Sequence, residues 1–426
     1  MTSPLRSAQL RRILIAYTVN RLGTWIGLLA LLVAVFDHTH NALAVSALLL
    51  AGQALPVFLV AAVVARVEAS ERRHELTGLY CFEALVTALL AVLMSHFSLP
   101  VVLFLAALDG VAALAASSLL RAEVARVARE QAERERTAMR FTPAQILDHS
   151  GPQVADSTEE AERKANAALN VCSSTSFVLG PVIGGAIVAA AGASTALFID
   201  AGSFLICGAL LLDLHPHVDE AEGGSVRARL RAAWRFISEA PSLRGLLLAE
   251  AVALVFFEAG APIEVTYAKT TLHAGDRGLG LLLTTWGAGG ILGSVAFARL
   301  VRRPLGVMLS VGTVVIAIGY LGLAVAPSLA LACIAGFAGG VGNGMQWPSL
   351  ISIVQRLSPA RLHGRLMGAV ESLGALAVAI GLPLGGVLVA LSSPRVAFVV
   401  IGLGALAVTV ALAKLSLDRR AAPELA

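Results

Sequence analysis

The chain has 426 residues, of which 57% are hydrophobic and only 14% are charged, and its formal net charge is +4. Soluble domains carry about 25% charged residues, so this composition excludes an ordinary water-soluble protein and indicates a chain that has lipid as its solvent. The small net charge does not favour nucleic-acid binding. We find no phosphate-binding loop, metal-ligand spacing or catalytic constellation, so we expect no enzyme, no cofactor and no metal.

Twelve apolar segments are long enough to cross a bilayer as helices, which takes about 20 residues. They cover residues 13–36, 42–65, 76–96, 99–119, 167–191, 195–214, 244–268, 278–299, 305–326, 329–354, 364–391 and 395–415. Basic residues precede the first segment, as in a signal peptide, but it is too long and Asn20 and Arg21 interrupt it, so we interpret it as a retained helix. The predicted fold class is all-α and integral to the membrane, with twelve transmembrane helices.

Basic residues collect on one side of these segments. With the N-terminus in the cytoplasm, all but four of the 32 Lys and Arg residues fall in the cytoplasmic tails and connections. The exceptions are Arg21, inside the membrane, and Lys269, Arg277 and Arg395, on the other side. By the positive-inside rule, the sequence predicts a multi-pass membrane protein with both termini in the cytoplasm. Arginine outnumbers lysine 29 to 3, which indicates a GC-rich bacterial genome and hence a bacterial inner membrane.

Two long cytoplasmic connections divide the chain. Residues 120–165 form an insertion whose opposite charges, three and four residues apart, predict a solvated helix that extends the preceding span. Residues 215–243 link an N-terminal six-helix half, 1–214, to a C-terminal half, 244–426. The linker contains a basic amphipathic segment, which either lies along the membrane surface or is an ordinary solvated helix.

A glycine–proline break occurs once in each half. Gly180-Pro181-Val182-Ile183-Gly184-Gly185 has a weaker counterpart in Gly381-Leu382-Pro383-Leu384-Gly385-Gly386, and the two double glycines are 201 residues apart. Glycines allow close helix approach, and a proline removes one backbone hydrogen bond and permits a bend. Paired breaks in a duplicated bundle are typical of a secondary transporter, and they predict a gating interface. A tight helix contact without a gating role is the alternative.

Longer stretches carry a resemblance to a known family. Residues 166–212, 278–303 and 359–391 resemble helices 5–6, 7–8 and 10–11 of the major facilitator superfamily, and most of all its bacterial branch of enterobactin exporters and macrolide-efflux-type proteins. The resemblance implies two pseudo-symmetric six-helix halves, with the first, fourth, seventh and tenth helices lining a central cavity. The first glycine–proline break resembles the antiporter motif of proton-coupled drug exporters in this superfamily.

Two positions depart from the family pattern. The connection between the second and third helices keeps basic residues, Arg66, Arg72 and Arg73, but lacks the usual aspartate. The fourth helix lacks the arginine of many drug–proton antiporters, and only Asp109, followed by Gly110, stands near its place. Both departures count against proton-coupled drug antiport and leave the fold unaffected.

Ionisable side chains inside a bilayer are expensive, so each is a candidate for function. Arg21 and Asp109 lie about 12 Å and about 15 Å from the ends of their helices, at 1.5 Å per residue, so we expect them to pair or to share the cavity. An apolar site disfavours a charged carboxylate, which suits a proton carrier. The candidate proton-coupling groups are Asp109, Glu258 and, more weakly, Glu371. Glu83 and Asp200, on peripheral helices, are interpreted as structural groups, and a structural role is the alternative for the other three.

Polar and aromatic side chains collect on the helix over 329–354. The candidate substrate-cavity residues are Asn343, Gln346 and Trp347 from this helix, with Asn20, Arg21 and Trp286 from others. Amides can hydrogen-bond a substrate, and tryptophan can stack on a flat or cationic one. Helix packing with interfacial amides is the alternative.

These features favour a secondary active transporter that exports a small amphipathic molecule, such as a drug, siderophore or secondary metabolite, driven by the proton gradient. The alternatives are an importer or facilitator on the same fold, and a membrane-embedded sensor or scaffold that transports nothing. The expected partners are membrane lipid, a small-molecule substrate and protons. We expect a monomer that binds no nucleic acid.

Overall fold

The computed structural model describes residues 8–56, 75–140, 153–212, 241–300, 302–357 and 363–420. The connection with Arg66, Arg72 and Arg73 and most of the 215–243 linker lie outside these residues. Within the described part, every regular element is a helix, which confirms the all-α fold class. The helices are α1 (Ala8–Thr39), α2 (Ala42–Leu49), η2 (Leu50–Ala54), α4 (Glu75–Leu93), η3 (Met94–His96), α5 (Leu99–Arg140), α6 (Gln153–Leu210), α8 (Pro241–Thr266), η5 (Tyr267–Thr271), α9 (Gly275–Arg299), α10 (Leu305–Val325), α11 (Leu329–Arg356), α12 (His363–Leu391) and α13 (Pro394–Arg420).

Nine helices among the described residues are long and apolar enough to cross a membrane. Two shorter apolar helices, Ala42–Ala54 and Pro394–Val410, accompany them. The long helix α6 contains two of the expected spans, which separate at Gly192, where φ is 83° and glycine is favoured. The expected span over 42–65 leaves the described part after residue 56. The count of twelve therefore stays a prediction.

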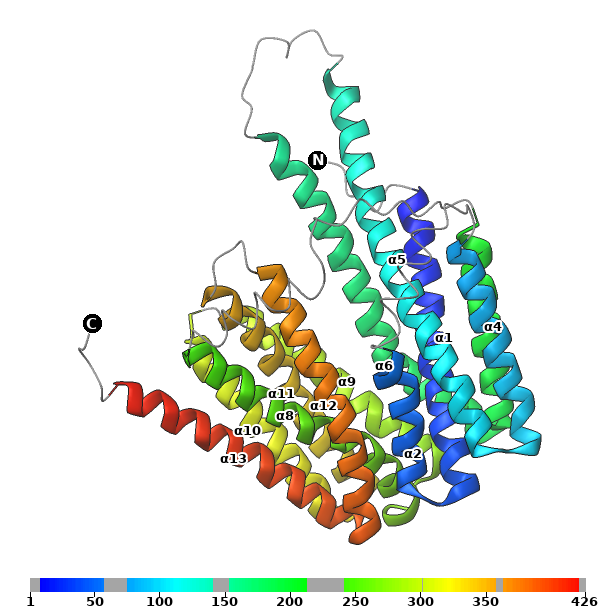
Figure 1. Ribbon diagram of the computed structural model, residues 1–426, viewed down its shortest axis with the longest axis vertical. Helices are drawn as coiled ribbons and strands as arrows, with labels where there is room; N and C mark the ends of the chain where they lie inside the picture. The colour runs from blue at the N-terminus through cyan, green and yellow to red at the C-terminus, as the bar shows by residue number, and fades with distance from the viewer. Residues whose placement is uncertain are drawn as a thin grey trace.

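Two helix bundles stand side by side (Figure 1). The helices α1, α2, α4, α5 and α6 pack together in the N-terminal half, and α8 to α13 pack together in the C-terminal half. The halves touch chiefly where α6 contacts α9 and where α2 contacts α12. We call the end of the bundle at which α1 begins and α13 ends the terminal face. The end at which α1 stops, at Thr39, and α13 begins, at Pro394, is the opposite face.

The buried apolar side chains form three clusters, and their distribution shows how the halves meet. The largest cluster combines both halves and includes Phe36 of α1 with Tyr267 and Phe398 of the C-terminal half. A second cluster, with Leu10, belongs to the N-terminal half alone, and a third, with Val354, to the C-terminal half alone. The shared cluster reaches the opposite face, whereas Leu10 and Val354 lie toward the terminal face. The halves therefore share a core toward the opposite face and pack separately toward the terminal face.

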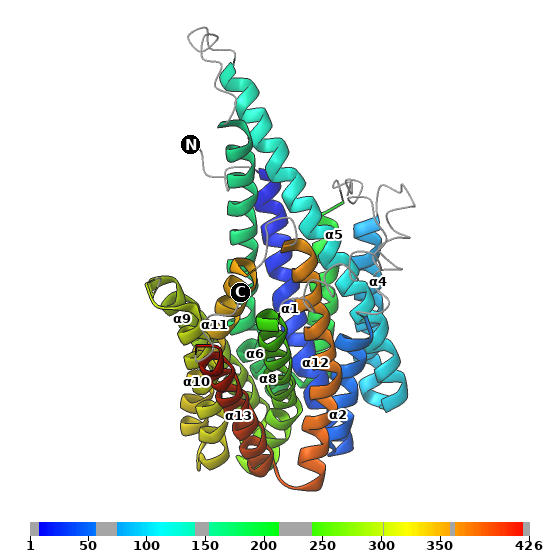
Figure 2. The ribbon, with the colours of Figure 1, turned by 60° about the vertical axis from the view of Figure 1, so that its left-hand side comes forward.

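The helices α5 and α6 continue beyond the rest of the bundle at the terminal face (Figures 1 and 2). Arg126 pairs with Glu123 and Glu130, three and four residues away, as the charge pattern predicts. The first turns of this extension are packed, however, because Val124 is fully buried in the cluster around Leu10. The expectation of a solvated helix from residue 120 onward was wrong for these turns, since apolar residues at helical spacing pack against α1 and α6.

Candidate functional site

At the first glycine–proline break, α6 contacts one helix of its own half and one helix of the other half. A Cβ atom on Gly184 would lie 3.1 Å from the backbone of α1, in the same half. A Cβ atom on Gly185 would instead lie 2.7 Å from the carbonyl oxygen of Asp276 in α9, in the other half. From the α9 side, a Cβ atom on Gly280 would lie 2.3 Å from the Pro181 carbonyl oxygen. Only glycines permit this approach of α6 to α9.

The second break repeats the arrangement with the halves exchanged. A Cβ atom on Gly385 would lie 2.1 Å from the Ala259 carbonyl oxygen of α8, in its own half. A Cβ atom on Gly386 would lie 2.4 Å from Ser46 Oγ of α2, in the other half. Pro383 lies inside α12 as Pro181 lies inside α6. The helix that carries each double glycine thus contacts one helix of its own half and one of the other half. We call the two contacts between the halves, α6 with α9 and α12 with α2, the seam; they are pseudo-symmetric.

An ion pair also joins the halves at the opposite face. Lys269, in η5, donates hydrogen bonds of 2.8 and 3.0 Å from Nζ to the two carboxylate oxygens of Asp37, at the end of α1. The same ammonium group pairs with Asp276, in the first turn of α9. The Lys269 side chain is 14% exposed, so solvent screens these pairs less than pairs on an open surface. They link the two halves beside the shared core.

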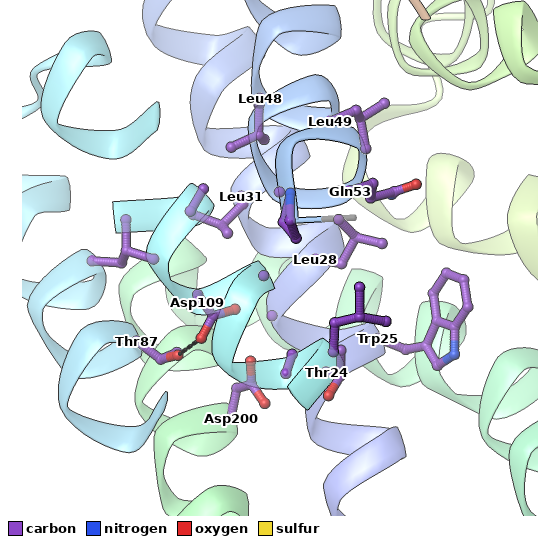
Figure 3. Close-up of a pocket in the computed structure, with 18 of the residues that line it drawn as sticks. Thr24, Trp25, Leu28, Leu31, Leu48, Leu49, Gln53, Thr87, Asp109 and Asp200 are labelled. Atoms are coloured by element: carbon purple, nitrogen blue, oxygen red, sulfur yellow. Dashed lines mark hydrogen bonds between the residues drawn. The ribbon is translucent and has the colours of Figure 1, made fainter. Parts of the chain in front are cut away.

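The N-terminal half contains a cavity of about 430 Å³ between α1, α2, η2, α4, α5 and α6 (Figure 3). Its wall combines charged and polar side chains with many leucines. The lining residues are Arg21, Thr24, Trp25, Gly27, Leu28, Leu31, Leu48, Leu49, Gly52, Gln53, Pro56, Thr87, Leu90, Ala106, Asp109, Gly110, Ala113, Leu114, Ser117, Leu197 and Asp200. The cavity can therefore offer a ligand both apolar contact and fixed charge.

Two carboxylates reach this cavity from α5 and α6 (Figure 3). Thr87 Oγ1, on α4, donates a hydrogen bond of 3.3 Å to Asp109 Oδ1. Asp200 is only 5% exposed, and Ser203 Oγ donates a bond of 3.4 Å to its Oδ1. A Cβ atom on Gly27 would lie 2.0 Å from Asp200 Oδ2, so a glycine in α1 makes the space for this carboxylate.

Arg21 enters the same cavity from α1. Among the described residues no ion pair joins it to Asp109 or Asp200, and its buried Nε has no hydrogen-bond partner. Glu83, on α4 one turn before Thr87, is 1% exposed and does not line the cavity. The arginine and the two aspartates thus share one cavity without neutralising one another directly.

Sequence comparisons point to one family. A family model described as Major Facilitator Superfamily matches residues 246–426. The multidrug efflux pump Tap of Mycobacterium tuberculosis (strain ATCC 25618 / H37Rv) is 27% identical over 260 residues, which cover 58% of this chain and 61% of the pump. The uncharacterized MFS-type transporter YfiS of Bacillus subtilis (strain 168) is 26% identical over 249 residues, which cover 55% and 58%. The chain thus spans about three fifths of the length of these curated relatives.

Solved structures agree on the fold. A bacterial homologue of the iron transporter ferroportin, in an inward-facing state, superposes with a TM-score of 0.68 at 16% identity, covering 96% of this chain and 99% of that one. The nucleoside transporter NupG superposes with a TM-score of 0.68 at 10% identity, over 96% and 99% of the two chains. The C-terminal half of the chain thus matches the major facilitator superfamily by sequence, and the described part of the chain has the fold of these transporters. The resemblance stated from the sequence is confirmed, and so is the superfamily's fold.

Within this superfamily fold, Trp286 is a packing residue of the C-terminal half. It is 8% exposed and stacks on Tyr320 of α10 with ring centroids 5.3 Å apart. Its ring also faces Gly339 of α11, where an added Cβ would lie 2.5 Å from the indole. Trp286 therefore fills the space between α9, α10 and α11 and does not line the cavity of the N-terminal half.

Gln346 is engaged with a buried acid. Its Nε2 donates a hydrogen bond of 2.9 Å to Glu250 Oε2 of α8, and the two residues are 8% and 2% exposed. The other carboxylate oxygen of Glu250 has no hydrogen-bond partner among the described residues. Gln346 thus links α11 to α8, which is the packing role predicted from the sequence as the alternative.

The other predicted residues are dispersed. Asn20 is buried and Asn343 half-buried, and neither lines the cavity of the N-terminal half. Trp347 is 42% exposed. Glu258 is half-buried on α8, with its Cβ beside Gly381 of α12, and Glu371 is exposed on α12. Of the predicted cavity and proton-coupling residues, only Arg21 and Asp109 line this cavity.

Asp200, Thr87 and Trp25 also line the cavity, although they were not predicted from the sequence. Asp200 was interpreted as structural because it lies on a peripheral helix. The signal that it approaches α1 was present in the glycines of that helix, Gly23 and Gly27, which lie one turn apart and face it. Among the described residues no group of three or more His, Cys, Asp or Glu side chains is placed to hold a metal ion.

Proposed function

We propose that the protein is a proton-coupled exporter of a small amphipathic molecule, which works by alternating access in the bacterial inner membrane. The observation that carries this proposal is the cavity of about 430 Å³ in the N-terminal half, with Asp109 in its wall. We also propose that the protein acts as a monomer.

The mixed wall of the cavity supports an amphipathic substrate. Leu28, Leu31, Leu48 and Leu49 form one apolar side (Figure 3), and Asp109 stands on another. Ligand sites of this kind bury an apolar body and orient it with a few polar groups. The substrate we propose is therefore a drug-like compound, a siderophore or another secondary metabolite of that character.

The seam supports alternating access. The halves share a core only toward the opposite face, and glycines let α6 slide closely on α9 and α12 on α2. Small residues at an interface allow two packed helices to shift without side-chain interlocking. Rocking about this seam would open the opposite face while the separate cores stay intact.

Proton coupling is proposed on the strength of burial. A charged carboxylate inside a membrane is costly, and taking up a proton removes that cost. Asp109 combines such a site with direct access to the cavity, so it ranks first among the candidates. Glu258 and Glu371, which do not line this cavity, rank below it. Separate substitution of Asp109 and Glu258 tests this ranking.

Export is proposed from two likenesses. Tap, with which this chain aligns over three fifths of its length, is a multidrug efflux pump. The break at Gly180–Gly185 resembles the antiporter motif of drug exporters. An importer or facilitator on the same fold is the second candidate, since the cavity alone does not set direction.

Transport into membrane vesicles tests the function. We would prepare inside-out and right-side-out vesicles with and without the protein and add a labelled library of amphipathic compounds, with and without an imposed proton gradient. Export predicts gradient-dependent accumulation in the inside-out vesicles alone. Accumulation in right-side-out vesicles would identify an importer, and gradient-independent equilibration a facilitator. Binding without movement of any compound would identify a sensor or scaffold.

The orientation has its own test. A fluorescent reporter fused after the last residue should be active in the cytoplasm, and an epitope inserted at His40 should be reached from outside. The reverse pattern would invert the proposed membrane orientation and with it the direction of each vesicle experiment.

A further inference from the structure

Two hydrogen-bond donors in the wall of the cavity have no acceptor. Arg21 Nε and Trp25 Nε1 are buried, and among the described residues neither has a partner. Both residues belong to α1 and line the cavity, and their spacing of four places them on one face of the helix. A buried donor without an acceptor destabilises a protein until a partner arrives. This part of the cavity is therefore suited to an anionic or other acceptor group.

The two aspartates form a separate acidic part. Asp109 and Asp200 approach the cavity from α5 and α6, while the indole of Trp25 extends away from them (Figure 3). Thr87 and Ser203 supply one hydrogen bond to each carboxylate, and Arg21 forms an ion pair with neither. Each carboxylate keeps acceptor capacity for a ligand.

We propose that this cavity binds a small amphipathic zwitterion. Its anionic group accepts hydrogen bonds from Arg21 and Trp25, and its ammonium group lies beside Asp109 and Asp200. The leucines between α1 and α2 hold its apolar body. The proposal rests on the proposed function in one respect, since it takes this cavity as the transport site.

Charge balance favours a zwitterion over a simple ion. With one aspartate protonated, the positive charge of Arg21 balances the other aspartate, and the cavity wall is neutral. A zwitterion keeps the occupied cavity neutral, whereas a simple cation or anion adds an uncompensated charge inside the membrane. A singly charged ligand also leaves either the donors or the carboxylates without a partner.

Three matched probes test the proposal. Homophenylalanine is a zwitterion; removing its carboxylate gives 3-phenylpropylamine, and removing its amine gives 4-phenylbutanoate. Binding to the full chain in lipid nanodiscs would be measured by titration calorimetry, with no proton gradient. We expect homophenylalanine to bind at least about ten-fold more tightly than either relative, since both parts of the cavity are satisfied only by the zwitterion.

Single substitutions test which residues bind the anionic group of the ligand and which bind its ammonium group. Trp25→Phe keeps an aromatic ring and removes one donor, so it should weaken homophenylalanine and 4-phenylbutanoate but leave 3-phenylpropylamine within about two-fold. Arg21→Gln removes the positive charge, so it should weaken the two compounds that carry a carboxylate and should not weaken 3-phenylpropylamine. Asp200→Asn should weaken homophenylalanine and 3-phenylpropylamine instead. Arg299→Gln, which removes an exposed arginine at the end of α9, is the control and should change none of the three.

The outcomes that overturn the proposal need no variant. If 3-phenylpropylamine binds as tightly as homophenylalanine, the ligand is a simple cation; if 4-phenylbutanoate does, it is an anion. If none of the three binds, the zwitterion site does not exist. The proposed function fails separately, because the vesicle experiment measures gradient-driven movement and this titration does not. If the ten-fold preference for the zwitterion is found but no transport is detected, the proposed binding site is supported and the proposed transport function is wrong.

Discussion

The N-terminal half encloses a cavity with charged side chains in its wall, whereas the centre of the C-terminal half is filled. In the C-terminal half, Trp286, Tyr320 and Phe398 stack in succession, with ring centroids 5.3 and 6.0 Å apart. The ring centroid of Phe257 lies 5.9 Å from that of Trp286. Both halves are built on one helical plan, so the difference arises from side chains and not from topology.

Glycines act differently in the two halves. In the C-terminal half a Cβ atom on Gly344 would lie 2.0 Å from the Gly290 carbonyl oxygen, and one on Gly340 would lie 2.0 Å from the Trp286 carbonyl oxygen. These glycines bring α9 and α11 into backbone contact and leave no space for a ligand. In the N-terminal half, Gly27 makes space for the carboxylate of Asp200. A duplicated fold can thus use the same residue type to close one half and to admit a functional group into the other.

The largest effect on transport is expected from substituting Asp109, the buried acid in the cavity of the N-terminal half. Asp109→Asn should reduce gradient-driven accumulation by about 100-fold or more, because the charge change that couples the proton is lost. Glu258→Gln, in the C-terminal half, should retain most of it. Transport in inside-out vesicles and the pH dependence of substrate binding are the measurements. The pH dependence should flatten in Asp109→Asn, although Glu83 and Asp200 remain nearby on α4 and α6.

The opposite result for these two variants would move the coupling site into the C-terminal half. If both variants keep wild-type, gradient-driven transport, the two acids are structural and another group, such as Glu371, couples the proton.

A branched side chain at either double glycine should lower the transport rate. Gly185→Val should lower transport by at least about ten-fold without preventing membrane insertion, because the new side chain would press on the backbone of α9. Gly386→Val should have a smaller effect, since its nearest neighbour is the movable hydroxyl of Ser46. Gly374→Val, on α12 with open space around it, is the matched control.

Transport rates normalised to the amount of folded protein decide this prediction. Equal rates for the wild type and Gly185→Val would show that the double glycine only packs and that the halves do not rock about it.

Removing the hydrogen-bond donor to a buried acid should destabilise the protein more in the C-terminal half than in the N-terminal half. Gln346→Leu should destabilise the protein by about 1–3 kcal/mol, because Glu250, which is 2% exposed, loses its hydrogen-bond donor. Thr87→Val, which removes the donor to Asp109, should cost less, about 1 kcal/mol or below, because the cavity admits water to that carboxylate. Thermal unfolding in detergent would show both losses, and an equal loss would contradict the view that water reaches Asp109 more readily than Glu250.

The smallest effect is expected at the ion pair across the opposite face. Lys269→Met should weaken closure by about 1 kcal/mol, since the pair is partly exposed. Spin labels at Thr39→Cys and Thr271→Cys would report it as a larger population of long distances between the halves. An unchanged distance distribution would mean that the shared apolar core alone keeps this face closed.

Much of this protein could be read from the sequence. Long apolar segments predicted helices in lipid because no soluble fold buries so much apolar surface, and paired breaks at Gly184 and Gly385 predicted two related halves. Those inferences depend on composition and local periodicity, which the sequence carries directly. Asp109 and Arg21 were found for the same reason, because a charge inside an apolar helix is visible without any tertiary contact.

The tertiary structure alone decided which of the polar residues meet. Trp286 and Gln346 have the same chemistry as cavity residues, yet both are packed between helices, because their environment depends on side chains from α8, α10 and α11. Asp200 lines a cavity because two glycines of α1 admit it, and these lie more than 170 residues away in the chain. Helical periodicity shows on which face of its own helix a residue lies. Which helix lies opposite that face, and whether the space between is filled or open, depends on packing among segments distant in the sequence.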